Sequence, residues 1–171
     1  MAICRNDRGQ DDHPHEHTHW GRLMKVLWVE DHEPVRDMLA IAADKAARSR
    51  VQVDLVMAPT LMAAEARLRL ERFDLVVLDL GLPDSIDPDM TIARVANMGK
   101  YRIAVVSSLD SRDEVVDSAV RCGANIHPQA IFKANLPFNR FIQRPDAFED
   151  FLMDLMPQTA AAAGKPVVRA A

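Results

Sequence analysis

Short, continuously apolar runs alternate along the chain with longer stretches whose apolar residues recur at helical spacing. The apolar runs predict strands at 26–29, 51–56, 74–78, 103–106 and 130–132. Strands that are apolar on both faces are typical of a parallel sheet covered by helices on each side. Five such runs separated by helical stretches therefore predict an α/β fold, a three-layer α/β/α sandwich with a five-stranded parallel sheet.

Helical periodicity and boundary residues place the helices between these runs. The periodicity predicts helices within 34–46, 61–70, 88–98, 115–122 and 148–156. Pro34 lies in the first turn of the first helix, where its missing N–H costs nothing. Asp87 is predicted to cap the third helix, and Gly99 and Gly123 to end the third and fourth. Asp84 is assigned to a turn rather than to a ligand set.

Length and composition predict one folded domain with two tails. Of 171 residues 49% are apolar, which is enough for a sizeable core. We expect the domain at 24–156, between a disordered leader at 1–23 and a disordered Ala-rich tail at 157–171. Alternating histidines in the leader could bind Zn²⁺, Ni²⁺ or Cu²⁺. They have no structural-zinc spacing, and a solvated tail is the preferred interpretation.

Net charge, apolar run length and cysteine content indicate which partners and which cellular compartment to expect. A net charge of −4 speaks against a broad nucleic-acid-binding patch. No apolar run reaches the roughly 18–20 residues that span a bilayer, so no membrane association is predicted. Cys4 and Cys122 lie far apart and fit a reducing cytosol better than a disulfide scaffold. The sequence therefore predicts a cytoplasmic protein.

Polar side chains follow four of the five apolar runs, at the points where the predicted strands end. Glu30 and Asp31 follow the first run, Asp79 the third, Ser107 the fourth and Lys133 the fifth. In open parallel sheets the carboxyl ends of the strands meet at one edge, where ligands bind. Three carboxylates at close range repel one another, and a divalent cation removes that repulsion. Oxygen-only ligands suit Mg²⁺.

The same residues suit phosphoryl transfer. Asp79 is the candidate nucleophile, because it stands alone after a central strand and carboxylates form aspartyl-phosphates. Ser107 could donate a hydrogen bond to a phosphate oxygen, and Lys133 could pair with the phosphate as a compact charge. The pattern predicts a Mg²⁺-dependent phosphoryl-accepting site.

Four segments of the chain resemble the receiver domain of response regulators. The segment 27–34 is similar to the family's opening strand, acid pair and first helix start, and 74–85 to its phosphoacceptor strand and following loop. The segments 105–108 and 122–124 are similar to the strand that ends in a hydroxyl residue and to the Gly-Ala that closes the fourth helix. The resemblance covers about 24–156.

The resemblance implies a CheY-like sheet of strand order 2-1-3-4-5 and a role for each site residue. The implied metal ligands are Glu30, Asp31, Asp79 and the backbone carbonyl of Gly81, with Asp79 also the phosphoacceptor, Ser107 the switch hydroxyl and Lys133 the phosphate-pairing lysine. The expected cofactor is Mg²⁺.

The region around the lysine departs from the family's pattern. The interval from Gly123 to Lys133 is longer than usual, and Ala134 follows the lysine in place of proline. Ala130 occupies the slot expected for an aromatic switch residue.

The stretch 134–144 reads as an insertion before the last helix. Its apolar side chains would either lie exposed on a loop, as a candidate partner contact, or pack back on the domain. These side chains are Phe138, Phe141 and Ile142.

These observations predict a stand-alone phosphoacceptor response regulator, a signalling switch rather than a metabolic enzyme. A sensor histidine kinase or histidine phosphotransfer protein would donate the phosphoryl group, and a downstream protein, not yet identified, would receive the output. Homodimer formation is left open by the sequence. A second hypothesis is a phosphorylation-independent interaction module on the same scaffold, because fold does not fix function. A third makes the His-rich leader a metal sensor.

Overall fold

The computed structural model describes residues 23–49 and 51–157 of the chain. The histidines of the predicted leader and the Ala-rich predicted tail lie outside the described residues. In the described part, no helix is long and apolar enough to cross a membrane.

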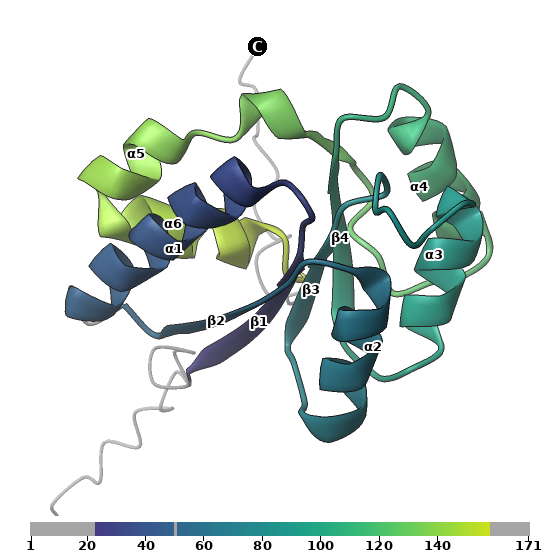
Figure 1. Cartoon of the computed structure of the whole chain (residues 1–171), viewed down its shortest axis with the longest axis horizontal. Coiled ribbons are helices and arrows are strands. Elements are labelled where there is room, and N and C mark those ends of the chain that lie inside the picture. The colour runs from purple at the N-terminus through teal and green to yellow at the C-terminus, as the bar shows by residue number, and fades with distance from the viewer. Residues whose placement is uncertain (1–22, 50, 158–171) are drawn as a thin grey trace, which may run out of the picture.

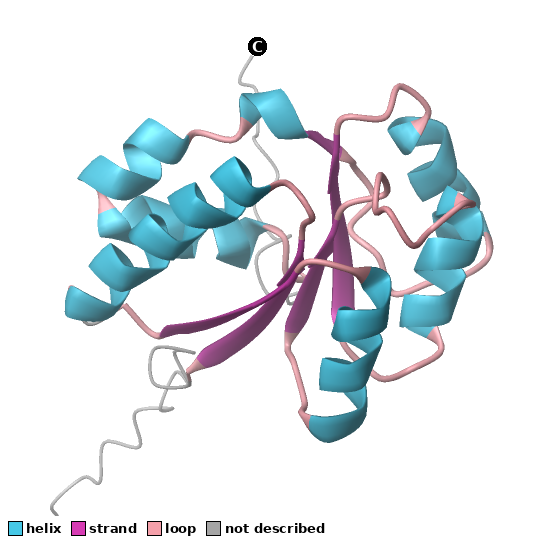
Figure 2. Ribbon diagram, in the orientation of Figure 1, coloured by secondary structure: helices cyan, strands magenta, loops and turns pink. Residues whose placement is uncertain are grey.

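The centre of the molecule is a five-stranded parallel sheet with strand order β2-β1-β3-β4-β5 (Figures 1 and 2). The strands are β1 (Met24–Val29), β2 (Val53–Ala58), β3 (Leu75–Leu78), β4 (Arg102–Ser107) and β5 (Ile131–Phe132). All pairings are parallel. The predicted α/β fold and the predicted strand order are therefore confirmed.

Helices cover both faces of the sheet (Figure 1). They are α1 (Glu33–Arg48), α2 (Leu61–Leu70), α3 (Pro88–Ala96), α4 (Arg112–Arg121), α5 (Phe138–Gln143) and α6 (Pro145–Asp154), with a 3₁₀ turn, η1 (Lys133–Asn135), before α5. Successive side chains of a strand point to opposite faces. Leu27 thus joins the core under α2, α3 and α4, whereas Trp28 joins the core under α1, α5 and α6.

Two aspartates in the loop between β3 and α3 cap helices. Asp87 caps α3, where its carboxylate accepts a hydrogen bond from the backbone N–H of Asp89 at 3.0 Å. Asp84 reaches a different helix and accepts from the backbone N–H groups of Leu61 at 2.9 Å and Met62 at 2.8 Å. Both residues are structural, as predicted. The capping contact of Asp84 also ties the loop after Asp79 to the start of α2.

The stretch 134–144 contains the end of η1 and helix α5, and the alternative of an exposed apolar loop is wrong. Phe141 is 1% exposed, with its ring centroid 5.2 Å from that of Phe148 and 5.1 Å from that of Phe151. The apolar residues of this stretch recur at i, i+3 and i+4, which is the spacing of one helix face. A helix of six residues is not stable alone, so packing against α1 and α6 holds α5 in place.

Candidate functional site

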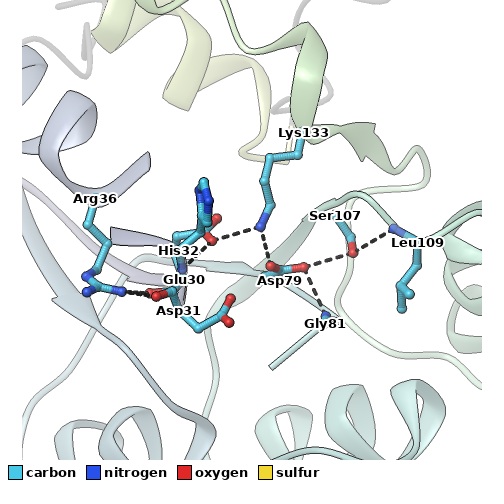
Figure 3. A network of polar contacts seen from close by, with 9 residues as sticks. All are labelled: Glu30, Asp31, His32, Arg36, Asp79, Gly81, Ser107, Leu109 and Lys133. Carbon is cyan, nitrogen blue, oxygen red and sulfur yellow. Dashed lines mark hydrogen bonds and ion pairs between the residues drawn. The ribbon is translucent and has the colours of Figure 1, made fainter. Parts of the chain in front are cut away.

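The predicted site residues meet at the carboxyl edge of the sheet because of strand register (Figure 3). The last residues of β1 and β3 are partners, Val29 with Leu78, so the acids that follow these strands lie side by side. Ser107 is the register partner of Phe132, so Lys133, which directly follows β5, lies beside the carboxyl end of β4. Glu30, Asp31, Asp79, Ser107 and Lys133 are brought together as the sequence predicted.

Asp79 lies at the centre of the site and is 3% exposed. Its Oδ1 accepts hydrogen bonds from the hydroxyl of Ser107 at 2.8 Å and from the backbone N–H of Gly81 at 3.0 Å. Its Oδ2 accepts a hydrogen bond from the ammonium group of Lys133 (Figure 3). Donors on both oxygens fix the orientation of this carboxylate; Ser107 lies at the end of β4 and Lys133 directly after β5.

Lys133 also pairs with Glu30, whose side chain is fully buried. The Lys133 Nζ atom lies 2.8 Å from Glu30 Oε1. Burial raises the pKa of Glu30, and the hydrogen bonds from Lys133 and from the backbone N–H of His32 only partly oppose it. Burial alone would lower the pKa of Lys133, but its hydrogen bonds to Asp79 and Glu30 outweigh burial and raise it. Lys133 therefore stays protonated and balances the charge of two buried acids.

The three acids form a group that fits a divalent cation. Glu30, Asp31 and Asp79 each offer one carboxylate oxygen, and these atoms lie within 4.8 Å of one another. Glu30 Oε2 is buried and accepts no hydrogen bond within the described part of the chain. A buried carboxylate oxygen without a partner is unfavourable, and a bound cation would satisfy it. A donor set made only of oxygen atoms suits Mg²⁺ rather than Zn²⁺ or Cu²⁺.

Arg36 of α1 is a site residue that the sequence analysis missed. Its guanidinium donates hydrogen bonds to the backbone carbonyl of Glu30 at 3.0 Å and to that of Asp31 (Figure 3). These contacts fix the turn that carries both acids. A helical arginine six residues after Glu30 looks like an ordinary surface residue in the sequence, so periodicity gave no signal.

Ser107 connects Asp79 to the loop before α4. Its hydroxyl oxygen accepts a hydrogen bond from the backbone N–H of Leu109 at 3.3 Å. Arg112, at the start of α4, donates to the carbonyl of Leu109 at 2.9 Å, and its guanidinium carbon lies 4.8 Å from the ring centroid of Phe132. A chain of contacts thus runs from Asp79 through Ser107 and α4 to the edge strand β5. Neither Arg112 nor its contact with Phe132 was predicted from the sequence.

The site opens into a cavity of about 630 Å³. Asp31, Asp79, Gly81, Ser107 and Lys133 line it, so the exposed backbone of Gly81 borders the acid group. His32, Ser108 and several apolar side chains line the rest of the cavity. Two of the apolar residues, Leu136 and Phe138, come from the insertion that follows Lys133.

Neither protein-family models nor curated proteins match the chain. Several solved structures, in contrast, match the chain in their fold. The BeF3-activated N-terminal receiver domain of RstA from Klebsiella pneumoniae is 25% identical, and the match covers 78% of this chain and 99% of that chain with a TM-score of 0.54. A CheY-like receiver domain protein from Methanospirillum hungatei is 18% identical, over 77% of this chain and 98% of that chain, with a TM-score of 0.55.

A third match gives the same result. Chemotaxis protein CheY4 of Vibrio cholerae is 20% identical over 78% of this chain and 99% of that chain, with a TM-score of 0.55. These three structures are each matched over almost their whole length, and the five parallel strands of this chain occur in the predicted order. The described part of this chain has the fold of a CheY-like response regulator receiver domain.

Proposed function

We propose that this chain is a phosphoacceptor response regulator, in which Asp79 accepts a phosphoryl group from a sensor histidine kinase or a histidine phosphotransfer protein. One observation carries the proposal: Asp79 is held between the Ser107 hydroxyl and the Lys133 ammonium, with Glu30 and Asp31 beside it. This set combines a nucleophile, a hydrogen-bond donor, a cation and a candidate metal site.

In the proposed transfer, a carboxylate oxygen of Asp79 bonds to phosphorus. The bond between phosphorus and the donor's histidine nitrogen breaks, and its electron pair stays on the nitrogen. Glu30, Asp31, Asp79 and the backbone carbonyl of Gly81 would hold Mg²⁺, which neutralises charge on the phosphoryl oxygens when bound. Lys133 would pair with a second phosphoryl oxygen, and Ser107 would donate a hydrogen bond to a third.

The contacts of Ser107 suggest how the signal would leave the site. Its hydroxyl now donates to Asp79 and accepts from the N–H of Leu109. If the hydroxyl turns toward a phosphoryl group, the loop before α4 must adjust. The contact between Arg112 and Phe132 would then change as well. A two-state surface around α4, β5 and α6 would respond, and a downstream protein or a second copy would bind it.

In this proposal the protein is a cytoplasmic switch that catalyses only its own phosphorylation and dephosphorylation.

A phosphorylation-independent interaction module is the second candidate, and one observation favours it. Lys133 already pairs with both Glu30 and Asp79, so the acids are partly balanced without a metal ion. Such a balanced ion cluster would also suit a purely structural role.

The test is the mass of the intact protein after incubation with acetyl phosphate, with and without Mg²⁺. We expect a gain of one phosphoryl group that requires Mg²⁺ and is lost in Asp79→Asn. Asp110→Asn is the matched control, because Asp110 is an exposed carboxylate in the loop that follows β4. No gain with acetyl phosphate or with a phosphorylated phosphotransfer protein, in a folded chain, would favour the interaction module instead.

A further inference from the structure

The cavity beside Asp79 is larger than a phosphoryl group needs. Its volume of about 630 Å³ lies within the range of sites that bind small organic molecules. Besides the site residues, His32, Ser108 and Ala134, its lining contains four large apolar side chains, which form an apolar wall: Val35, Leu109, Leu136 and Phe138. The cavity therefore has room, and a suitable surface, for the organic part of a phosphodonor.

Phe138 is the aromatic member of this apolar wall, and it is held rigidly from behind. Its ring lies edge-on to that of Phe141, with the centroids 6.2 Å apart. Phe141 is buried and packs on Phe148 and Phe151 of α6. Phe138 itself is half-buried, and it borders the cavity at the start of α5, which packs beside α1 (Figure 1). A ring supported in this way loses little freedom when a ligand contacts it.

We propose that Phe138 contacts the imidazole ring of a phosphohistidine or phosphoimidazole donor and so determines which phosphodonors Asp79 accepts. The inference rests on the proposed phosphoacceptor function. An imidazole can stack on Phe138 or meet its edge, a geometry that aromatic pairs favour. Acetyl phosphate has no ring and cannot make this contact.

The transfer step balances without any further reactant. A carboxylate oxygen of Asp79 forms the new bond to phosphorus, and the bond between phosphorus and the imidazole nitrogen breaks. The imidazole keeps that electron pair and leaves as a neutral ring after taking a proton from water. Phe138 takes no part in the bond changes; it orients the leaving ring.

The experiment compares the rates of Mg²⁺-dependent phosphorylation by phosphoimidazole and by acetyl phosphate. We expect Phe138→Ala to lower the rate with phosphoimidazole by about fivefold, which corresponds to one aromatic contact, and to change the rate with acetyl phosphate by less than about twofold. Phe138→Tyr keeps the ring and should keep the preference. Ile142→Ala is the control, because Ile142 is half-buried on the same helix but does not line the cavity.

Equal losses with both donors, or no loss with either, would overturn the assignment of Phe138. If Phe138→Ala fails to fold by circular dichroism, Phe138→Leu replaces it, since leucine keeps apolar packing but lacks a ring; it must show the same donor-selective loss. Failure of the proposed function itself looks different, because the wild-type chain would then be labelled by neither donor.

Discussion

Replacing Lys133 with methionine would leave two buried carboxylates without their shared cation. The side chain of Lys133 is 14% exposed, and those of Glu30 and Asp79 are 0% and 4% exposed. Removing one partner from a buried ion pair destabilises a protein by about 3–5 kcal/mol, because the remaining charge stays buried. We expect Lys133→Met to lose about 3 kcal/mol of unfolding free energy at pH 8 in EDTA, the lower end of that range, since the backbone N–H of His32 still donates to Glu30 and the Ser107 hydroxyl still donates to Asp79.

Magnesium should restore much of this loss. A cation bound by Glu30 and Asp79 would take over the charge balance that Lys133 provides. A ligand present at about 100 times its dissociation constant stabilises the folded state by about 2.7 kcal/mol. The stabilisation by Mg²⁺ should therefore be larger in Lys133→Met than in the wild-type chain, where the ammonium group competes for the same oxygens.

Urea denaturation followed by tryptophan fluorescence measures both effects. Trp28 is buried on β1, two residues before Glu30. The chain has two tryptophans, so all variants also carry Trp20→Phe, which leaves Trp28 as the only tryptophan that fluoresces. Lys100→Met, at an exposed lysine, is the control. A loss below about 1 kcal/mol in EDTA, or an equal Mg²⁺ effect in both chains, would refute the view that Lys133 balances these acids.

Two further predictions concern stability away from the site. The chain has a single tyrosine, and burial raises the pKa of Tyr101 to about 12. The unfolded phenol titrates at about 10, so the unfolding free energy should fall by about 2–3 kcal/mol as pH rises from about 10 to about 12. Phenolate absorbance of folded and urea-unfolded protein checks the two pKa values, and coinciding titrations would contradict the prediction. Asp84→Ala should cost about 1 kcal/mol through lost capping of α2, measured by urea denaturation; Asp84→Asn, which keeps an acceptor oxygen, should cost less.

The convergence of the site residues was predictable from the sequence because it depends only on topology. Each polar residue directly follows an apolar run, and a parallel sheet brings all such positions to one edge. The apolar runs of β1 and β3 are almost completely buried, so their strand assignment was clear. With the strand order that the resemblance to receiver domains implies, β1 and β4 flank β3, so Asp79 was expected to lie near Glu30 and near Ser107.

The contacts of individual arginine side chains were not predictable in the same way. Arg36 bonds to backbone carbonyls of the turn before its own helix, and Arg112 stacks on a phenylalanine of β5. Neither contact changes the apolar periodicity, which is the main signal that a single sequence provides for secondary structure. Helix α5 was missed because Pro137 and Pro145 bracket it closely, and so short a segment reads as a loop.

The long interval between Gly123 and Lys133 did not displace the lysine, and strand register explains why. The segment between Gly123 and Lys133 first forms an isolated β-bridge near the start of β4, in which Ile126 pairs with Ile103. The N–H of His127 donates a hydrogen bond to the carbonyl of Ile103 at 2.7 Å. The chain then leaves the sheet and returns as β5, whose last residue is the partner of Ser107. Since the pairing with β4, and not the length of the preceding loop, determines where Lys133 lies, the ammonium group reaches Asp79 despite the unusual spacing.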